Sequence, residues 1–127
     1  MKKFPPERIV CLTEETVETI YLLGEEKRIV GVTGYATRPK QVRNEKPRIS
    51  SFISANIDKI IDLEPDLILA FSDIQSEIVS NLIKKGQSVL CFNQRDIEGI
   101  FNMIQTISNL LDIKQKGINL ISKLKNN

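Results

Sequence analysis

Residues 56–71, with the sequence NIDKIIDLEPDLILAF, decide the fold. The first half has the isoleucine spacing of a short helix that Asn56 can cap and that Pro65 ends. The second half, residues 67–71, is an uninterrupted apolar run, which is typical of a strand buried on both faces. A helix that leads so directly into such a strand is the repeating unit of a parallel α/β sheet.

The same alternation continues on both sides of this stretch. Three further apolar runs predict strands at residues 8–13, 28–33 and 88–92. Helical patterns follow the first, third and fourth strands, and the expected N-caps are Thr13, Asp73 and Asp96. The inner faces of the last two of these helices are expected to include Ile74, Ile83, Ile97 and Ile100. A final helix is predicted over residues 114–125.

These elements predict one domain of the α/β class, a three-layer α/β/α Rossmann-like lobe with a four-stranded parallel sheet in the order 2-1-3-4. The second and third strands are joined by a segment of roughly twenty residues, which we expect to be a functional or mobile loop. Cys11 and Cys91 then lie two strands apart, about 9.5 Å, which is too far for a disulfide bond. Both are expected to be buried thiols.

The composition excludes several classes of function. The chain has 127 residues and a net charge of +2, which is too close to neutral to indicate nucleic-acid binding. It contains no histidine and only two cysteines, which excludes His-based triads and the usual zinc sites. No glycine-rich phosphate-binding motif follows a strand, so a nucleotide-binding enzyme is not favoured. No apolar run is long enough to span a membrane.

Charged residues gather in three places. Residues 36–48 contain five basic residues and one acid, and residues 114–127 contain four lysines and no acid. Such segments are usually solvated, and the alternative is that they attract an anionic ligand or partner. The acids around Pro65 are expected to be solvated turn carboxylates rather than a metal site, namely Asp62, Glu64 and Asp66.

The candidate ligand site lies beyond the carboxyl ends of the strands, where the strand order reverses. The loops at this edge are expected to begin at Thr13, Thr33, Phe71 and Phe92. Three aromatic residues lie in or beside segments that leave these ends, namely Tyr35, Phe52 and Phe71. They either close the top of the core or form a shallow apolar wall for a large flat ligand, with Arg38 at its edge.

Several motifs occur in an order and at a spacing that identify a family. They are RIVCLT at 8–13, LG at 23–24, RIVGVT at 28–33, NIDKI at 56–60, LEPDLILA at 63–70 and GQSV at 86–89. Together they resemble the N-terminal lobe of the periplasmic substrate-binding proteins of ABC importers, in the subgroup that carries vitamin B12, ferric siderophores or haem. The resemblance covers residues 8–125.

This resemblance implies a ligand held between two lobes that a long helix joins. Residues 1–113 would form the ligand-binding lobe, and residues 114–127 the start of the connecting helix. Tyr35, Phe52 and Phe71 match aromatic positions that line the ligand in B12-binding members.

Two further roles follow from the resemblance. Asp58 matches an acidic residue that docks onto arginines of the membrane permease. Thr13, at the end of the first strand, begins the first loop of the expected ligand face, and Thr13-Glu14 stands where members often have Ser-Pro. The basic segment around Arg38 also departs from the B12-type pattern, so an anionic ferric siderophore or haem fits it as well as a corrinoid.

Three hypotheses for the function remain open at this stage. The first is an importer's ligand-binding lobe with no catalysis and no cofactor. The second is an enzyme on a flavodoxin-like or Rossmann-like fold, and the third is a one-lobed regulatory or scaffold relative without transport. The opening MKKFPP is not a complete signal peptide, so we expect a periplasmic or cell-surface location if a signal was trimmed and a cytoplasmic one otherwise. Self-association through the exposed inter-lobe face is a further expectation.

Overall fold

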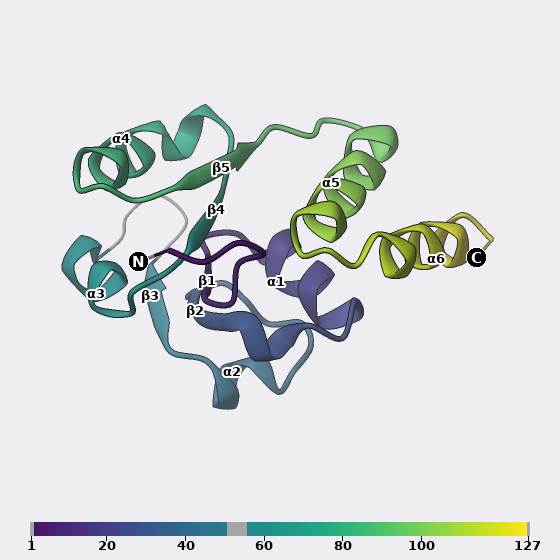
Figure 1. The fold of residues 1–127 in the computed structure, drawn as a ribbon, viewed down its shortest axis with the longest axis horizontal. Helices are drawn as coiled ribbons and strands as arrows, with labels where there is room; N and C mark the ends of the chain where they lie inside the picture. Colours follow the sequence, from purple (N-terminus) through teal and green to yellow (C-terminus); the bar gives the residue numbers. More distant parts are fainter. Residues whose placement is uncertain (1, 51–55, 127) are drawn as a thin grey trace.

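Five short parallel strands form the centre of the computed structural model, which describes residues 2–50 and 56–126 (Figure 1). They are β1 (Ile9–Cys11), β2 (Ile29–Thr33), β3 (Arg48–Ser50), β4 (Leu67–Phe71) and β5 (Val89–Phe92). Their order across the sheet is β3-β2-β1-β4-β5, and every neighbouring pair is parallel. The α/β class and the relative order of the four predicted strands are confirmed, whereas the predicted number of strands is wrong.

The additional strand, β3, lies in the segment that the sequence predicts as a loop. It pairs with the outer side of β2, where Val32 is opposite Arg48. A short helix, α2 (Val42–Glu45), precedes it and buries Val42. Ile49 is the apolar residue that the strand adds to the core. Three residues with one apolar side chain give no periodic pattern, which is why the sequence does not reveal this edge strand.

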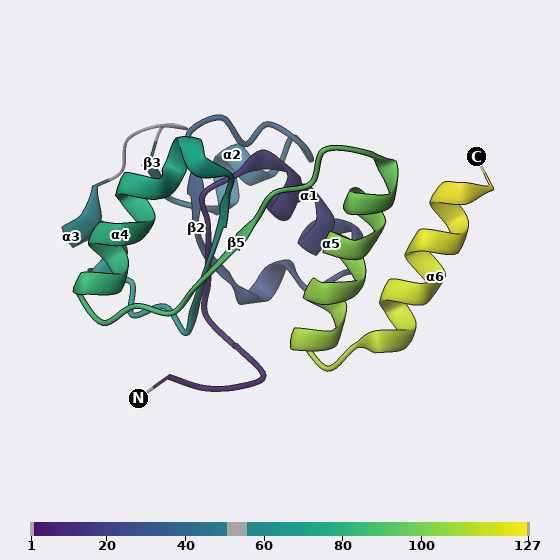
Figure 2. The ribbon, with the colours of Figure 1, turned by 90° about the horizontal axis from the view of Figure 1, so that it is seen from above.

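Helices cover both faces of the sheet, as expected of a three-layer lobe (Figures 1 and 2). The longer ones are α1 (Glu14–Leu22), α3 (Ile57–Asp62), α4 (Ser76–Lys84), α5 (Ile97–Leu110) and α6 (Lys114–Lys125). α1 and α5 pack on one face, and α3 and α4 pack on the other. α6 lies against α5 on the side away from the sheet. No helix in the described part of the chain has the length and apolar character needed to cross a membrane.

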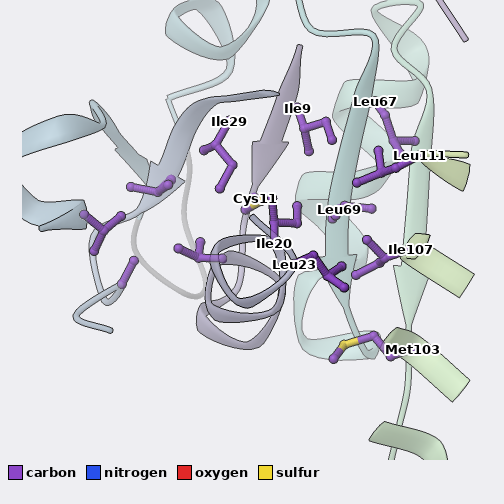
Figure 3. Packing of buried hydrophobic residues seen from close by; sticks show 14 of the residues in the cluster. Ile9, Cys11, Ile20, Leu23, Ile29, Leu67, Leu69, Met103, Ile107 and Leu111 are labelled. Atoms are coloured by element: carbon purple, nitrogen blue, oxygen red, sulfur yellow. The ribbon is translucent and has the colours of Figure 1, made fainter. Parts of the chain in front are cut away.

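The apolar runs of the strands are continuous because alternate residues enter two different cores. In β1, Ile9 and Cys11 belong to the core under α1 and α5, whereas Val10 belongs to the core under α3 and α4. Figure 3 shows the first core, in which Ile20 of α1 and Ile107 of α5 meet these strand residues. Burial on both faces, which the uninterrupted runs predict, is therefore confirmed for β1, β2 and β4, whereas the residues of β5 are exposed or only partly buried.

Two helices do not bury all the apolar residues that their spacing predicts. The residues concerned are exposed by 40% or more, namely Ile74 (58%), Ile83 (55%), Ile97 (68%) and Ile100 (40%). Ile74 lies outside α4, because Ser72 rather than Asp73 caps a 3-10 turn, Asp73–Gln75, that precedes the helix.

The exposure of the other isoleucines depends on which side of each helix faces the sheet. Ile78 and Leu82 are the buried residues of α4, and Ile83, the next residue after Leu82, lies on a different side of the helix. α5 is capped by Asp96 as predicted, but Ile97 and Ile100 in its first turns line a hollow beside Phe71 instead of the core.

The two cysteines have different surroundings. Cys11 is fully buried in β1, and burial raises the pKa of its thiol to about 12. Cys91 lies on β5 and is exposed, so the prediction that both thiols are buried is wrong for this residue. β5 is the edge strand, as the predicted order implies, and all four of its residues are exposed or only partly buried. Both thiols are free, as the predicted strand order requires.

A buried carboxylate fixes the amino end of the sheet. Asp66 is 4% exposed, and its two oxygens accept hydrogen bonds from the backbone N–H groups of Lys3, Glu7 and Arg8 at 2.8–2.9 Å. Burial alone raises the pKa of this carboxyl, but the three N–H donors and the charge of Lys2 outweigh it and hold the pKa below its usual range. The prediction of a solvated turn carboxylate is therefore wrong for Asp66.

A second polar cluster joins the same end of the sheet to the last two helices. Glu25 pairs with Arg28 and with Lys116 of α6, both at 2.7 Å. Arg28 also donates to the carbonyls of Pro6 and Leu111. These contacts connect the N-terminal segment, the end of α1 and the turn between α5 and α6.

Candidate functional site

The carboxyl ends of the strands lie on the side of the molecule opposite the N-terminus (Figure 2). α1 begins there after β1, and α5 begins there after β5. β2 ends at Thr33, and after Gly34 the chain reaches Tyr35, which has 55% of its surface exposed. The backbone N–H of Tyr35 donates to the Thr33 hydroxyl at 3.3 Å.

Tyr35 and Phe71 line two neighbouring hollows at this end. The first, of about 210 Å³, lies between Thr33 and Tyr35 and the first turn of α1. The second, of about 330 Å³, lies between Phe71 and the start of α5. Glu15 lines both hollows, so the two aromatic residues flank the N-terminus of α1 on a single surface.

The second hollow contains residues that the sequence analysis did not assign to the site. They come from the loop after β5 and the first turn of α5, namely Gln94, Arg95, Ile97 and Ile100. The prediction that a loop of interest begins at Phe92 indicated this segment. The two isoleucines were missed because their helical spacing placed them in the core.

A buried glutamine lies below this surface and connects two of the strands that end there. The Gln75 amide oxygen accepts from the backbone N–H of Phe71 at 2.9 Å, and its nitrogen donates to the carbonyl of Leu12 at 3.0 Å. These bonds join the ends of β4 and β1, which are neighbours in the sheet. No sequence pattern indicates this role, because a glutamine near a helix start is ordinarily exposed.

Thr13 lies beneath the surface rather than on it. The residue is 1% exposed, and its hydroxyl lies 3.0 Å from the hydroxyl of Thr16. It occupies the N-cap position of α1 as predicted, but its side chain makes no capping hydrogen bond.

Arg38 is separated from the two aromatic hollows. Its guanidinium pairs with Glu18 at 3.2 Å, and 72% of its side chain is exposed. It lines a different hollow, of about 290 Å³, with Tyr21 and Leu22 on the flank of α1. The structure therefore places Arg38 on the flank of α1 and not in the aromatic wall.

Asp58 is remote from these hollows, on the α3 side of the sheet. It is exposed in the first turn of α3, whose cap Asn56 accepts from the backbone N–H of Lys59 at 3.0 Å. Within the described ranges its carboxylate makes no ion pair. Phe52, the third predicted aromatic residue, lies outside the described residues.

The arrangement offers a surface suited to binding. Its lining combines aromatic and aliphatic side chains with a few polar ones, Glu15, Gln94 and Arg95, as is usual in small-molecule sites. The described residues contain no cluster of acids and cysteines that could hold a metal ion.

A comparison with family models decides the identity. The model described as "Periplasmic binding protein" matches residues 9–127, which include every strand and helix named above. The chain belongs to the periplasmic binding protein family. The predicted resemblance is thereby confirmed at the level of the family.

Individual members of the periplasmic binding protein family agree with this assignment. An uncharacterised ABC transporter substrate-binding lipoprotein of Bacillus subtilis is 30% identical over 127 residues, which are 97% of this chain and 40% of the relative.

Two solved structures share the fold. A possible iron-binding periplasmic protein of Staphylococcus epidermidis has a TM-score of 0.87 at 26% identity, with 96% of this chain and 48% of that chain covered. The periplasmic vitamin B12-binding protein of Vibrio cholerae has a TM-score of 0.86 at 26% identity, with 98% and 49% covered. The chain thus spans about half the length of these periplasmic binding proteins.

Proposed function

We propose that this chain is the ligand-binding lobe of a substrate-binding protein of an ABC importer. The ligand is a corrinoid or an iron complex, either a ferric siderophore or haem. The observation that carries the proposal is the pair of aromatic residues, Tyr35 and Phe71, on one surface at the carboxyl end of the sheet. The similarity to a vitamin B12-binding and to a possible iron-binding protein supports this choice of ligand class.

The chemistry of the surface suits a large ligand with flat apolar parts and a polar rim. The exposed ring of Tyr35 and the exposed Ile97 offer apolar contact area. Arg95 beside Phe71 offers charge to propionates or to an anionic siderophore, and the exposed Arg38 on the flank of α1 is a second, separate arginine. Binding and release require no bond to be made, so the proposed function is not enzymatic.

The proposed partner is the membrane permease of the importer, at a periplasmic or cell-surface location. Asp58 is the proposed docking residue, because it is exposed and makes no ion pair in the described part of the chain. A charge at a docking surface mainly orients and accelerates association and is sensitive to salt. Asp58→Lys should weaken binding to the permease in vesicles and leave ligand affinity unchanged; equal permease binding by both proteins would refute this role.

Titration calorimetry with cyanocobalamin, haemin and a ferric hydroxamate siderophore tests the ligand. A ligand that two lobes would enclose meets one wall here, while most of the entropic cost of association remains. We therefore expect a Kd of about 1 μM or weaker for the preferred ligand. Tyr35→Ala and Phe71→Ala should each weaken binding about tenfold through lost aromatic contact.

Phe4→Ala is the matched control, because Phe4 is an aromatic residue that is 58% exposed and lies between Lys3 and Glu7, which bind Asp66 at the amino end of the sheet. If neither Tyr35→Ala, Phe71→Ala nor Phe52→Ala changed any affinity, the ligand surface would be misplaced. If Arg38→Ala alone weakened binding, the ligand would be an anionic iron complex and not a corrinoid.

A further inference from the structure

β5 forms an open edge of the sheet. Across residues 2–50 and 56–126 no strand pairs with its outer side, and in Figure 2 it is the strand nearest the viewer. The carbonyls of Ser88 and Phe92 accept hydrogen bonds from the β4 side. Because successive residues of a strand turn to its two sides alternately, the backbone polar groups of Val89 and Cys91 point to the open side.

The opposite edge, β3, is protected against the addition of another strand, and β5 is not. Pro47 precedes β3, Arg48 begins it, and its register with β2 shifts between Val32 and Thr33. Prolines, charges and irregular register are the usual features that prevent pairing at an edge. β5 has the sequence VLCF and carries none of them. An unprotected edge of this kind is suited to a second strand.

A groove runs beside the open edge, between β5 and α4. It has a volume of about 570 Å³, and one face of α4 lines it at helical spacing with Ser76, Val79, Ser80 and Ile83. Cys91 lines it from the strand. The two serines are small enough for a second helix to approach closely, and Ile83, 55% exposed, would bury apolar surface in such a contact.

The charges along α4 make this surface complementary to itself. Asp73 and Glu77 lie at its N-terminal end, and Lys84 and Lys85 lie at its C-terminal end. All four are exposed, and none of them has an ion-pair partner among the residues that the structure describes. A second α4 laid antiparallel to the first would place acids opposite lysines at both ends.

We propose that a second copy of this chain docks here, with the two β5 strands antiparallel about a two-fold axis at Cys91. With the axis at this position, Val89 pairs with Asn93 of the other copy, and all outward-pointing backbone N–H and C=O groups of β5 form hydrogen bonds. It places Leu90 opposite Phe92 of the other copy, both partly buried apolar residues. The ligand surfaces of the two copies then face in opposite directions and both stay open.

Sedimentation velocity of the reduced chain over a concentration series tests the proposal, with charge reversal as the discriminating change. Lys84→Glu alone and Asp73→Lys alone should each weaken dimerisation about tenfold, because each creates two like-charge contacts across the axis. An equimolar mixture of the two variants should restore the dimer, because both contacts are then complementary. Lys123→Glu on α6 makes the same charge change away from the edge and should have no effect.

Cross-linking locates the interface independently of its strength. A short bismaleimide should link two wild-type chains through Cys91, which is exposed, and should not link Cys91→Ser chains. Cys11 is buried and serves as the internal control. A monomer at every concentration overturns the proposal. The proposal is also overturned by a dimer that the charge reversals leave unchanged and that Cys91 does not cross-link. If Tyr35→Ala dissociates such a dimer, the interface lies at the carboxyl-end surface instead.

Discussion

The two ends of the same sheet differ in how their polar groups are used. At the amino end, Asp66 is 4% exposed and holds three backbone N–H groups, and Glu25 holds Arg28 and Lys116. At the carboxyl end, Tyr35 is 55% exposed and Ile97 is 68% exposed. The polar groups at the amino end therefore stabilise the fold, whereas the carboxyl end leaves contact area available for a ligand.

This difference has a physical cause. A buried carboxylate costs several kcal/mol of desolvation unless donors compensate it, so its presence requires a rigid arrangement around it. Exposed apolar side chains impose no such requirement, and they gain from burial only when a ligand or a partner covers them. Substitutions at the two ends should accordingly affect different measurements.

The largest effect is expected at the amino end, for Asp66→Ala. Removing the carboxylate leaves three backbone donors without their partner, and the free energy of unfolding should fall by about 3 kcal/mol. Urea denaturation followed by circular dichroism measures the change. Asp62→Ala is the control, because Asp62 is exposed in the same turn, and its effect should stay within about 0.5 kcal/mol. Equal effects of the two substitutions would show that the amino end is not fixed by Asp66.

Acid should reveal the same cluster without mutation. Burial alone raises the pKa of Glu25, but hydrogen bonds from Lys116 and Arg28 outweigh it, so the folded-state pKa values of both Glu25 and Asp66 lie below their usual ranges. A lowered folded-state pKa stabilises the fold above the unfolded-state value of about 4, and this contribution is lost as the pH falls through the folded-state pKa.

The free energy of unfolding should thus be steady from neutral pH to about pH 5 and decline below about pH 4. The decline should be shallower in Asp66→Ala, which lacks one of the two carboxylates. Parallel curves for the variant and the wild-type chain would contradict the assignment of this pH dependence to Asp66.

The smallest effect on stability is expected at the carboxyl end, for Tyr35→Ala. The side chain is largely exposed, so the free energy of unfolding should change by less than about 0.5 kcal/mol. The same denaturation experiment measures it. A loss comparable to that of Asp66→Ala would mean that Tyr35 closes the core, the alternative that the sequence left open, and is not part of an accessible wall.

Particular residues show where sequence reasoning succeeds. The N-caps Asn56 and Asp96 accept the hydrogen bonds that their positions predict, because a cap is a contact within three residues. The predicted span 67–71 matches β4, since burial on both faces produces an unbroken apolar run. Local patterns report local contacts well.

The failures concern contacts between distant segments. Asp66 is an ordinary turn acid in the sequence, and only the fold brings the backbone of Lys3, Glu7 and Arg8 to it. Ile97 continues a helical stripe in the sequence, but in the fold it is 68% exposed and lines the hollow beside Phe71. Cys91 lies in an apolar run typical of a buried strand, but β5 is an edge strand with incomplete burial, as the predicted strand order already implied.

The sequence by itself therefore determined the α/β class, four of the strands with their order, the caps of α3 and α5, and the family, because each depends on periodicity, turn chemistry or motif spacing along the chain. The tertiary structure decided that a fifth strand forms and that Asp66 is buried. It also decided that Tyr35 and Phe71 lie on one surface with Gln94 and Ile97, and that Arg38 lies outside this surface. Each of these depends on which segments the sheet brings together, and the energy of such long-range contacts leaves no periodic trace in the chain.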